Sequence, residues 1–140
     1  MGVRRKAREY AFQMLFQWDI THDAIDTIVD PFWETLETPE PQDVVDFANA
    51  LAKGTIEQVE KIDAIVQRHA DNWRLDRMAV ADRNLLRMAT YEFLNERENG
   101  EMPAAVIINE AIEIARRFSA EESPQFINGI LDSIRKEVAA

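Results

Sequence analysis

The chain has 140 residues, a formal net charge of −10 at pH 7 and no cysteine. This length suits one domain or two small subdomains, which bury roughly two-thirds of the surface of the unfolded chain. The lack of thiols excludes a disulfide framework and a cysteine nucleophile, and no apolar stretch is long enough for a membrane span. We therefore expect a cytoplasmic protein without a membrane partner.

The N-terminal stretch concentrates the positive charge of an otherwise acidic chain. Residues 1–8 contain no acid, and the rest of the chain carries a net charge of −14. The basic residues are Arg4, Arg5, Lys6 and Arg8. Charge that is segregated in this way indicates a localised contact with a polyanion, and a solvated helix face is the alternative interpretation.

The same stretch continues as a helix with two apolar surfaces. On a helical wheel, one arc of about 120° holds the residues that we expect to face the core: Val3, Ala7, Ala11, Met14, Leu15 and Trp18. Phe12 and Phe16 lie on the other side, which Arg5 and Arg8 share. Either the helix packs on both sides, or an exposed aromatic strip adjoins the basic residues. We favour exposure for Phe16, and both alternatives stay open for Phe12.

Helical spacing of apolar residues continues along the chain, and no run alternates clearly enough for a strand. A helix is expected around 25–36, with Pro31 either kinking it or opening a second one. The sequence TPEPQ at 38–42 predicts a loop. Residues 44–66 then predict two helices that join near Gly54.

The second half predicts further helices that begin near Leu85, Ile107 and Ser123. The sequence RENGEMP at 97–103 predicts a turn between the first two. Ser123 followed by Pro124 predicts a helix start, because a serine hydroxyl can cap the helix and proline is tolerated in the first turn. We therefore expect an all-α protein with at least six helices.

The sequence lacks the common catalytic and metal-binding motifs. His22 and His69 are far apart, and neither belongs to a Glu-x-x-His or His-Glu-x-x-His pair. The glycines form neither a GxGxxG motif nor a phosphate-binding loop, and no serine stands in GxSxG. We expect a protein that is not an enzyme and that needs no cofactor or metal.

Three stretches stand out together: RRKAREYAFQMLFQW (4–18), NWRLDRMAVADRNLLRMATYEFL (72–94) and VIINEAIEIARRFSAEESPQFINGILDSI (106–134). In combination they resemble the NusB family of bacterial transcription antitermination factors. The resemblance implies a NusB-like all-α fold of two small packed helical bundles. They would form a single domain over residues 1–140, with a subdomain boundary near 70–78.

The resemblance also implies a function. The family binds the boxA element of ribosomal RNA leader transcripts together with NusE, a small-subunit ribosomal protein, in an antitermination complex on RNA polymerase. The implied RNA contacts are Arg4, Arg5, Lys6 and Arg8. The implied NusE contacts are Phe16, Asp82, Glu122 and Phe126, and the wheel adds Phe12. Some relatives carry tyrosine at the position of Phe16, so an apolar contact is expected there without the hydroxyl.

Other functions also fit the sequence. A helical protein–protein adaptor or a homodimer, without direct RNA readout, would bury Phe12 and Phe16 against a second chain. An RNA-modifying enzyme is a further alternative, because NusB-like domains occur fused to RNA cytosine methyltransferases.

In the favoured interpretation the isolated chain binds RNA weakly, near the non-specific range of about 10⁻⁴ to 10⁻⁶ M, because its body is acidic. A basic partner would enlarge the positive surface.

Overall fold

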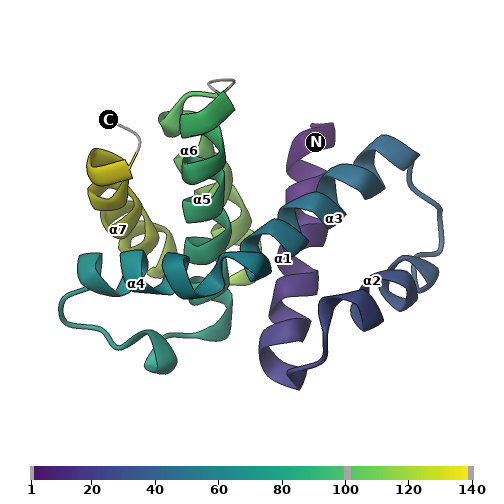
Figure 1. The fold of residues 1–140 in the computed structure, drawn as a ribbon, viewed down its shortest axis with the longest axis horizontal. Helices are drawn as coiled ribbons and strands as arrows, with labels where there is room; N and C mark the ends of the chain where they lie inside the picture. The colour runs from purple at the N-terminus through teal and green to yellow at the C-terminus, as the bar shows by residue number, and fades with distance from the viewer. Residues whose placement is uncertain (1, 100–101, 139–140) are drawn as a thin grey trace. The chain divides into compact units, whose positions relative to one another are not determined.

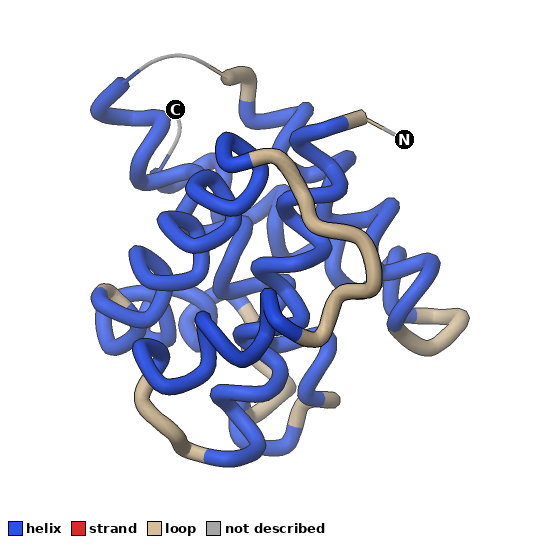
Figure 2. Tube along the Cα trace, turned by 90° about the vertical axis from the view of Figure 1, so that its right-hand side faces the viewer, coloured by secondary structure: helices blue, strands red, loops and turns tan. Residues whose placement is uncertain are grey.

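The structure is a computed structural model that describes residues 2–99 and 102–138. This part of the chain contains seven α-helices, one short 3₁₀ turn and no strand (Figures 1 and 2). The prediction of an all-α fold with at least six helices is confirmed. None of the helices in the described ranges is both long and apolar enough to cross a membrane.

The first compact unit, residues 1–57, contains α1 (Val3–Thr21), α2 (Ile25–Glu34) and α3 (Gln42–Glu57) (Figure 1). In this unit α1 packs against both α3 and α2. The indole N–H of Trp33 on α2 donates to Asn49 Oδ1 on α3 at 2.8 Å. The Trp33 ring also lies 5.1 Å, centroid to centroid, from the ring of Tyr10 on α1. Trp33 therefore connects all three helices.

The second unit, residues 58–140, contains α4 (Val59–His69), the 3₁₀ turn η1 (Leu75–Arg77), α5 (Val80–Asn99), α6 (Ala104–Phe118) and α7 (Ser123–Val138). In this unit α5 packs against α4, α6 and α7, and α4 also packs against α7. The division between the units lies between Glu57 and Gln58, earlier than the expected boundary near 70–78, because α4 packs with the helices that follow it.

Several predicted helix ends differ from the structure. Gly54 lies inside α3, and the junction falls at Gln58, where φ is −107° and ψ is 16°. Pro31 lies inside α2 and opens no second helix. The turn predicted at 97–103 is wrong for 97–99, because α5 continues to Asn99; residues 100 and 101 lie outside the described part. Arginine and glutamate are good helix formers, which explains the extension.

The core side of α1 is largely as predicted, but Trp18 is only half-buried and Val3 is exposed. Four residues of the predicted arc have no exposed surface: Ala7, Ala11, Met14 and Leu15. Val3 is 58% exposed, so its assignment to the core is wrong. It is the first residue of α1 and lies one turn before the first buried position, and helical periodicity does not show where packing against a neighbour begins.

A group of polar contacts joins the end of α4 to α7, and we call it the α4–α7 clasp (Arg68, His69, Ser133 and Glu137). Arg68 donates a hydrogen bond from Nε to Glu137 Oε1 at 2.8 Å and a second one from Nη2 to Glu137 Oε2. His69 Nε2 lies 2.8 Å from Glu137 Oε1, and His69 Nδ1 lies 2.7 Å from Ser133 Oγ. The hydrogen bonds from Arg68 and His69 lower the pKa of Glu137 to about 2.

We predict that Glu137→Gln lowers the resistance of the protein to urea near neutral pH. The native pKa of Glu137 lies below its ordinary value of 4.5, so its stabilising contribution is complete above that pH. The contribution is lost as the pH falls toward about 2. Urea midpoints measured across this range should therefore decline more steeply for the wild type than for the variant.

The matched control is Glu113→Gln, which removes a carboxylate that pairs with Arg116 one turn along α6. An ion pair within one helix contributes little, so this variant should follow the wild-type pH profile closely. Identical acid profiles for the wild type and Glu137→Gln would contradict the stabilising role of the clasp.

Candidate functional site

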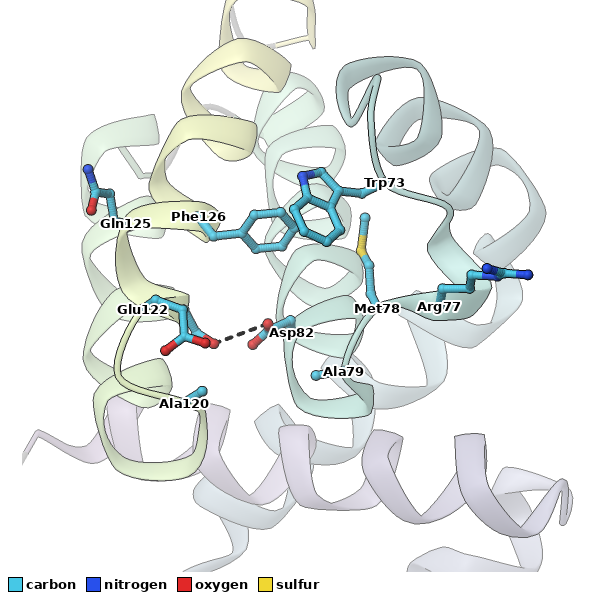
Figure 3. Close-up of a pocket in the computed structure, with 10 residues that line it drawn as sticks. Trp73, Arg77, Met78, Ala79, Asp82, Ala120, Glu122, Gln125 and Phe126 are labelled. Carbon is cyan, nitrogen blue, oxygen red and sulfur yellow. Dashed lines mark hydrogen bonds between the residues drawn. The ribbon is translucent and has the colours of Figure 1, made fainter.

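A cavity of about 470 Å³ opens in the second unit, where the segment around η1 meets the first turns of α5 and α7 (Figure 3). Its lining includes Trp73, Met78, Asp82, Glu122, Ser123 and Phe126. The structure therefore brings together three residues that the sequence analysis assigned to partner binding: Asp82, Glu122 and Phe126. We call this cavity the α5–α7 pocket.

One side of the α5–α7 pocket is aromatic. Trp73 is 57% exposed, and its ring centroid lies 5.6 Å from that of half-buried Phe126, with 78° between the planes. Figure 3 shows the two rings side by side, with the Met78 side chain directed toward them. Exposed aromatic rings that edge a cavity are typical of binding sites, because they offer a large apolar area at small entropic cost.

The other side of the pocket is acidic. Asp82 on α5 is buried, and its Oδ2 accepts a hydrogen bond from the Ser123 hydroxyl at 3.1 Å. Its Oδ1 is also buried and has no hydrogen-bond partner among the residues that the structure describes. Glu122 is exposed, and Arg77 points away from the cavity in Figure 3. A buried carboxylate oxygen without a donor is costly, so the pocket suits a cationic or N–H group placed between Asp82 and the aromatic rings.

Ser123 differs from its predicted role. The residue lies inside the first turn of α7, and its hydroxyl donates to Asp82, which places it in the pocket rather than in a flanking capping position. Pro124 occupies the first turn of α7, as predicted.

Gln67 on α4 holds the segment that carries Trp73. Its side-chain Nε2 donates to the carbonyl oxygen of Trp73 at 2.7 Å, and its Oε1 accepts from the backbone N–H of Leu75 at 2.8 Å. One side chain thus uses both ends of its amide to fix the backbone on either side of residue 74. This contact gives a loop residue a defined position at the edge of the pocket.

The basic residues of α1 have different environments. Arg4 is exposed, with Cζ lying 4.1 Å from the centroid of the Phe47 ring on α3. Lys6 is also exposed, and its Nζ lies 2.8 Å from Glu40 Oε1; this hydrogen bond raises the pKa of Lys6 and lowers that of Glu40. Arg5 is half-buried.

Arg8 is the exception among the basic residues. It is only 2% exposed, and its Cζ lies 5.5 Å from the Phe47 centroid. Such burial leaves almost no surface for a phosphate, so the expectation of a direct RNA contact at Arg8 does not fit the structure. The helical wheel could not show this, because Phe47 lies on another helix.

The two phenylalanines on α1 also differ. Phe12 is 2% exposed, which corresponds to the core alternative and leaves little surface for a partner. Phe16 is half-buried, and its ring meets that of Phe12 edge to face at a centroid distance of 6.1 Å. Phe16 therefore keeps accessible surface.

Sequence reasoning missed Trp73, Gln67 and Phe47. Trp73 carried a usable signal, because a large aromatic residue stands in the polar stretch ADNWRLDR without a helical apolar stripe. Gln67 and Phe47 carried none, since each acts through a contact with another element that sequence spacing does not reveal.

These features define a small all-helical binding protein, with a basic surface on its first unit and an acidic, aromatic-lined pocket on its second. The sequence model of the NusB family matches residues 5–136. The chain therefore belongs to the NusB family, and the resemblance seen in the sequence is confirmed.

Individual relatives are similar over nearly their whole length. The chain is 42% identical over 138 residues to the transcription antitermination protein NusB of Solibacter usitatus, covering 99% of this chain and 92% of the relative. It is 45% identical over 139 residues to the protein of the same name from Koribacter versatilis, with coverage of 99% and 92%.

Solved structures share the fold. NusB from T. maritima has a TM-score of 0.86 and 38% identity, covering 98% of this chain and 93% of that one. A chain in a crystal structure of antitermination factors NusB and NusE in complex with dsRNA has a TM-score of 0.85 at 23% identity, covering 98% of both chains. At that identity the likeness shows the fold alone.

We predict that Ser123→Ala lowers the free energy of unfolding by about 1–3 kcal/mol, because it leaves the buried Asp82 carboxylate without its hydroxyl donor. Urea denaturation measures this loss. In an Asp82→Ala background the same substitution should cost clearly less, since the acceptor is already absent. Equal costs in the two backgrounds would show that the hydrogen bond between Ser123 and Asp82 contributes nothing to stability.

Proposed function

We propose that this chain is an RNA-binding transcription antitermination factor that binds boxA RNA of ribosomal RNA leader transcripts together with a NusE-type partner. It would act in the cytoplasm, within an antitermination complex on RNA polymerase, by binding rather than by catalysis. The observation that carries the proposal is the meeting of Asp82, Glu122 and Phe126 in one pocket. Its family membership and the names of its relatives support the same function.

The α5–α7 pocket suits a basic protein partner. A lysine or arginine side chain entering it would lie between the Asp82 carboxylate and the rings of Trp73 and Phe126. The negative charge of the whole chain would also speed its encounter with a basic partner. Phe16 on the first unit is a second proposed partner contact, whereas buried Phe12 would support α1 from within.

The start of α1 suits RNA. Arg4, Arg5 and Lys6 keep accessible surface within a single turn of helix, whereas Arg8 is buried near the ring of Phe47. So few cations on an acidic protein give weak binding, because affinity for nucleic acid depends on the number of phosphates neutralised. A bound basic partner would add positive surface and groups that read unstacked bases.

We predict that Glu122→Lys weakens binding of the NusE-type partner at least tenfold in isothermal titration calorimetry. The substitution puts a lysine ammonium group at the pocket that is proposed to receive a basic side chain of the partner. The two positive charges would repel each other across the interface, which is costly. The matched control is Glu121→Lys, which makes the same change at an exposed neighbour outside the pocket lining. Equal effects of the two variants would indicate long-range attraction rather than docking at the pocket.

We also predict that Arg5→Gln combined with Lys6→Gln weakens boxA RNA binding by the complex and leaves partner affinity unchanged. Removing two phosphate contacts from a single strand should flatten the log–log dependence of affinity on salt by roughly one unit. The control removes two cations elsewhere, by Lys53→Gln on α3 and Lys61→Gln on α4. A loss of affinity with an unaltered salt slope would contradict direct phosphate contact at the start of α1.

A further inference from the structure

The position of Arg4 is set by an aromatic ring rather than by an acid. Its guanidinium carbon lies over the ring of Phe47, 4.1 Å from the centroid. Phe47 projects from α3, where Val44, Ala48 and Leu51 are buried, so the ring stands on a well-packed helix. A guanidinium group over an aromatic face gains cation–π energy and loses much of its rotational freedom. Arg4 is therefore presented in a defined orientation on an exposed surface.

Two neighbouring contacts distinguish Arg4 from the other cations of α1. Lys6 pairs with the carboxylate of Glu40, with 2.8 Å between Nζ and Oε1, so its ammonium group is oriented by an acid and can share its remaining N–H groups with a phosphate. Arg8 approaches the same Phe47 ring, at 5.5 Å, but is buried. Arg4 alone of these three combines an exposed side chain with a planar group that rests on an aromatic ring.

We propose that Arg4, stacked on Phe47, forms a binding site for one unstacked nucleobase of single-stranded RNA. The guanidinium plane would lie between the Phe47 ring and the base, with Phe47 acting as the positioning residue. Bases of single-stranded RNA stack on arginine planes as well as on aromatic rings. This site deepens the proposed function and rests on it, and it changes the expected role of Arg4 from a phosphate contact to a base contact.

The first test uses the full chain in complex with its NusE-type partner and a single-stranded boxA-type RNA. Arg4→Lys keeps the charge but removes the planar guanidinium group, so it should weaken RNA binding by roughly 5- to 140-fold, the range expected for loss of one stacked base. Phe47→Leu should produce a loss of RNA affinity of similar size. Phe47→Tyr keeps an aromatic ring, so it should bind the RNA more tightly than Phe47→Leu does. Partner affinity and urea midpoints identify any variant that loses RNA through misfolding. Arg4→Lys lies on the surface and should fold normally.

A scan of abasic nucleotides separates base stacking from phosphate binding. If Arg4 stacks on a base, one abasic position should weaken binding to the wild type and have little further effect on the Arg4→Lys complex. The stacking site would be overturned if Arg4→Lys bound the RNA as tightly as the wild type does. It would also be overturned if, at every nucleotide, the effects of the abasic position and of Arg4→Lys on RNA affinity were additive. Either result would leave the proposed function intact. A wild-type complex that fails to bind the RNA would overturn the proposed function, and the stacking site with it.

Discussion

The second unit depends on the burial of α5, which packs against α4, α6 and α7. Over residues 81–90 only Arg83 is not buried, so a charged residue of this stretch needs a partner inside the protein. Arg87 has one, through a two-point contact with Asp63 on α4, at 2.8 and 3.0 Å. A buried guanidinium without such a partner would be strongly destabilising. The same enclosure reaches the first turn of α5 and buries Asp82, which gives the pocket its acidic side.

Asp82 therefore belongs both to the packing of α5 against α7 and to the lining of the pocket. One of its oxygens accepts the Ser123 hydroxyl, while the other is buried with no donor in the described parts of the chain. An unsatisfied buried carboxylate oxygen raises the free energy of the folded protein, and a donor that reached it from the pocket would recover that cost. The aromatic side of the pocket, Trp73 with Phe126, adds apolar area without such a cost.

The sequence predicted what depends on local periodicity and missed what depends on contacts between elements. Helical spacing gave the all-α class and the buried positions Ala7, Ala11, Met14 and Leu15. The family motifs named Asp82, Glu122 and Phe126, which the fold brings to one cavity. Periodicity could not show that Arg8 is buried beside Phe47, because the side of a helix that its neighbours cover is decided by tertiary packing. Several helix ends lie at other residues than predicted for the same reason, as Gly54 illustrates, which lies inside α3 and not at its end.

The two hydrogen bonds of Gln67 couple the segment from 73 to 75 to the end of α4. The amide of Leu75 is protected by a side chain of α4, so the segment from 73 to 75 cannot separate from the last turns of α4 without breaking both bonds. Local fluctuations of the two segments are therefore expected to be cooperative, as in a single small foldon. A ligand that rests on Trp73 would slow hydrogen exchange in α4, a helix that contributes none of the pocket residues named above. Substitutions in α4 could in turn tune ligand residence time without touching the ligand.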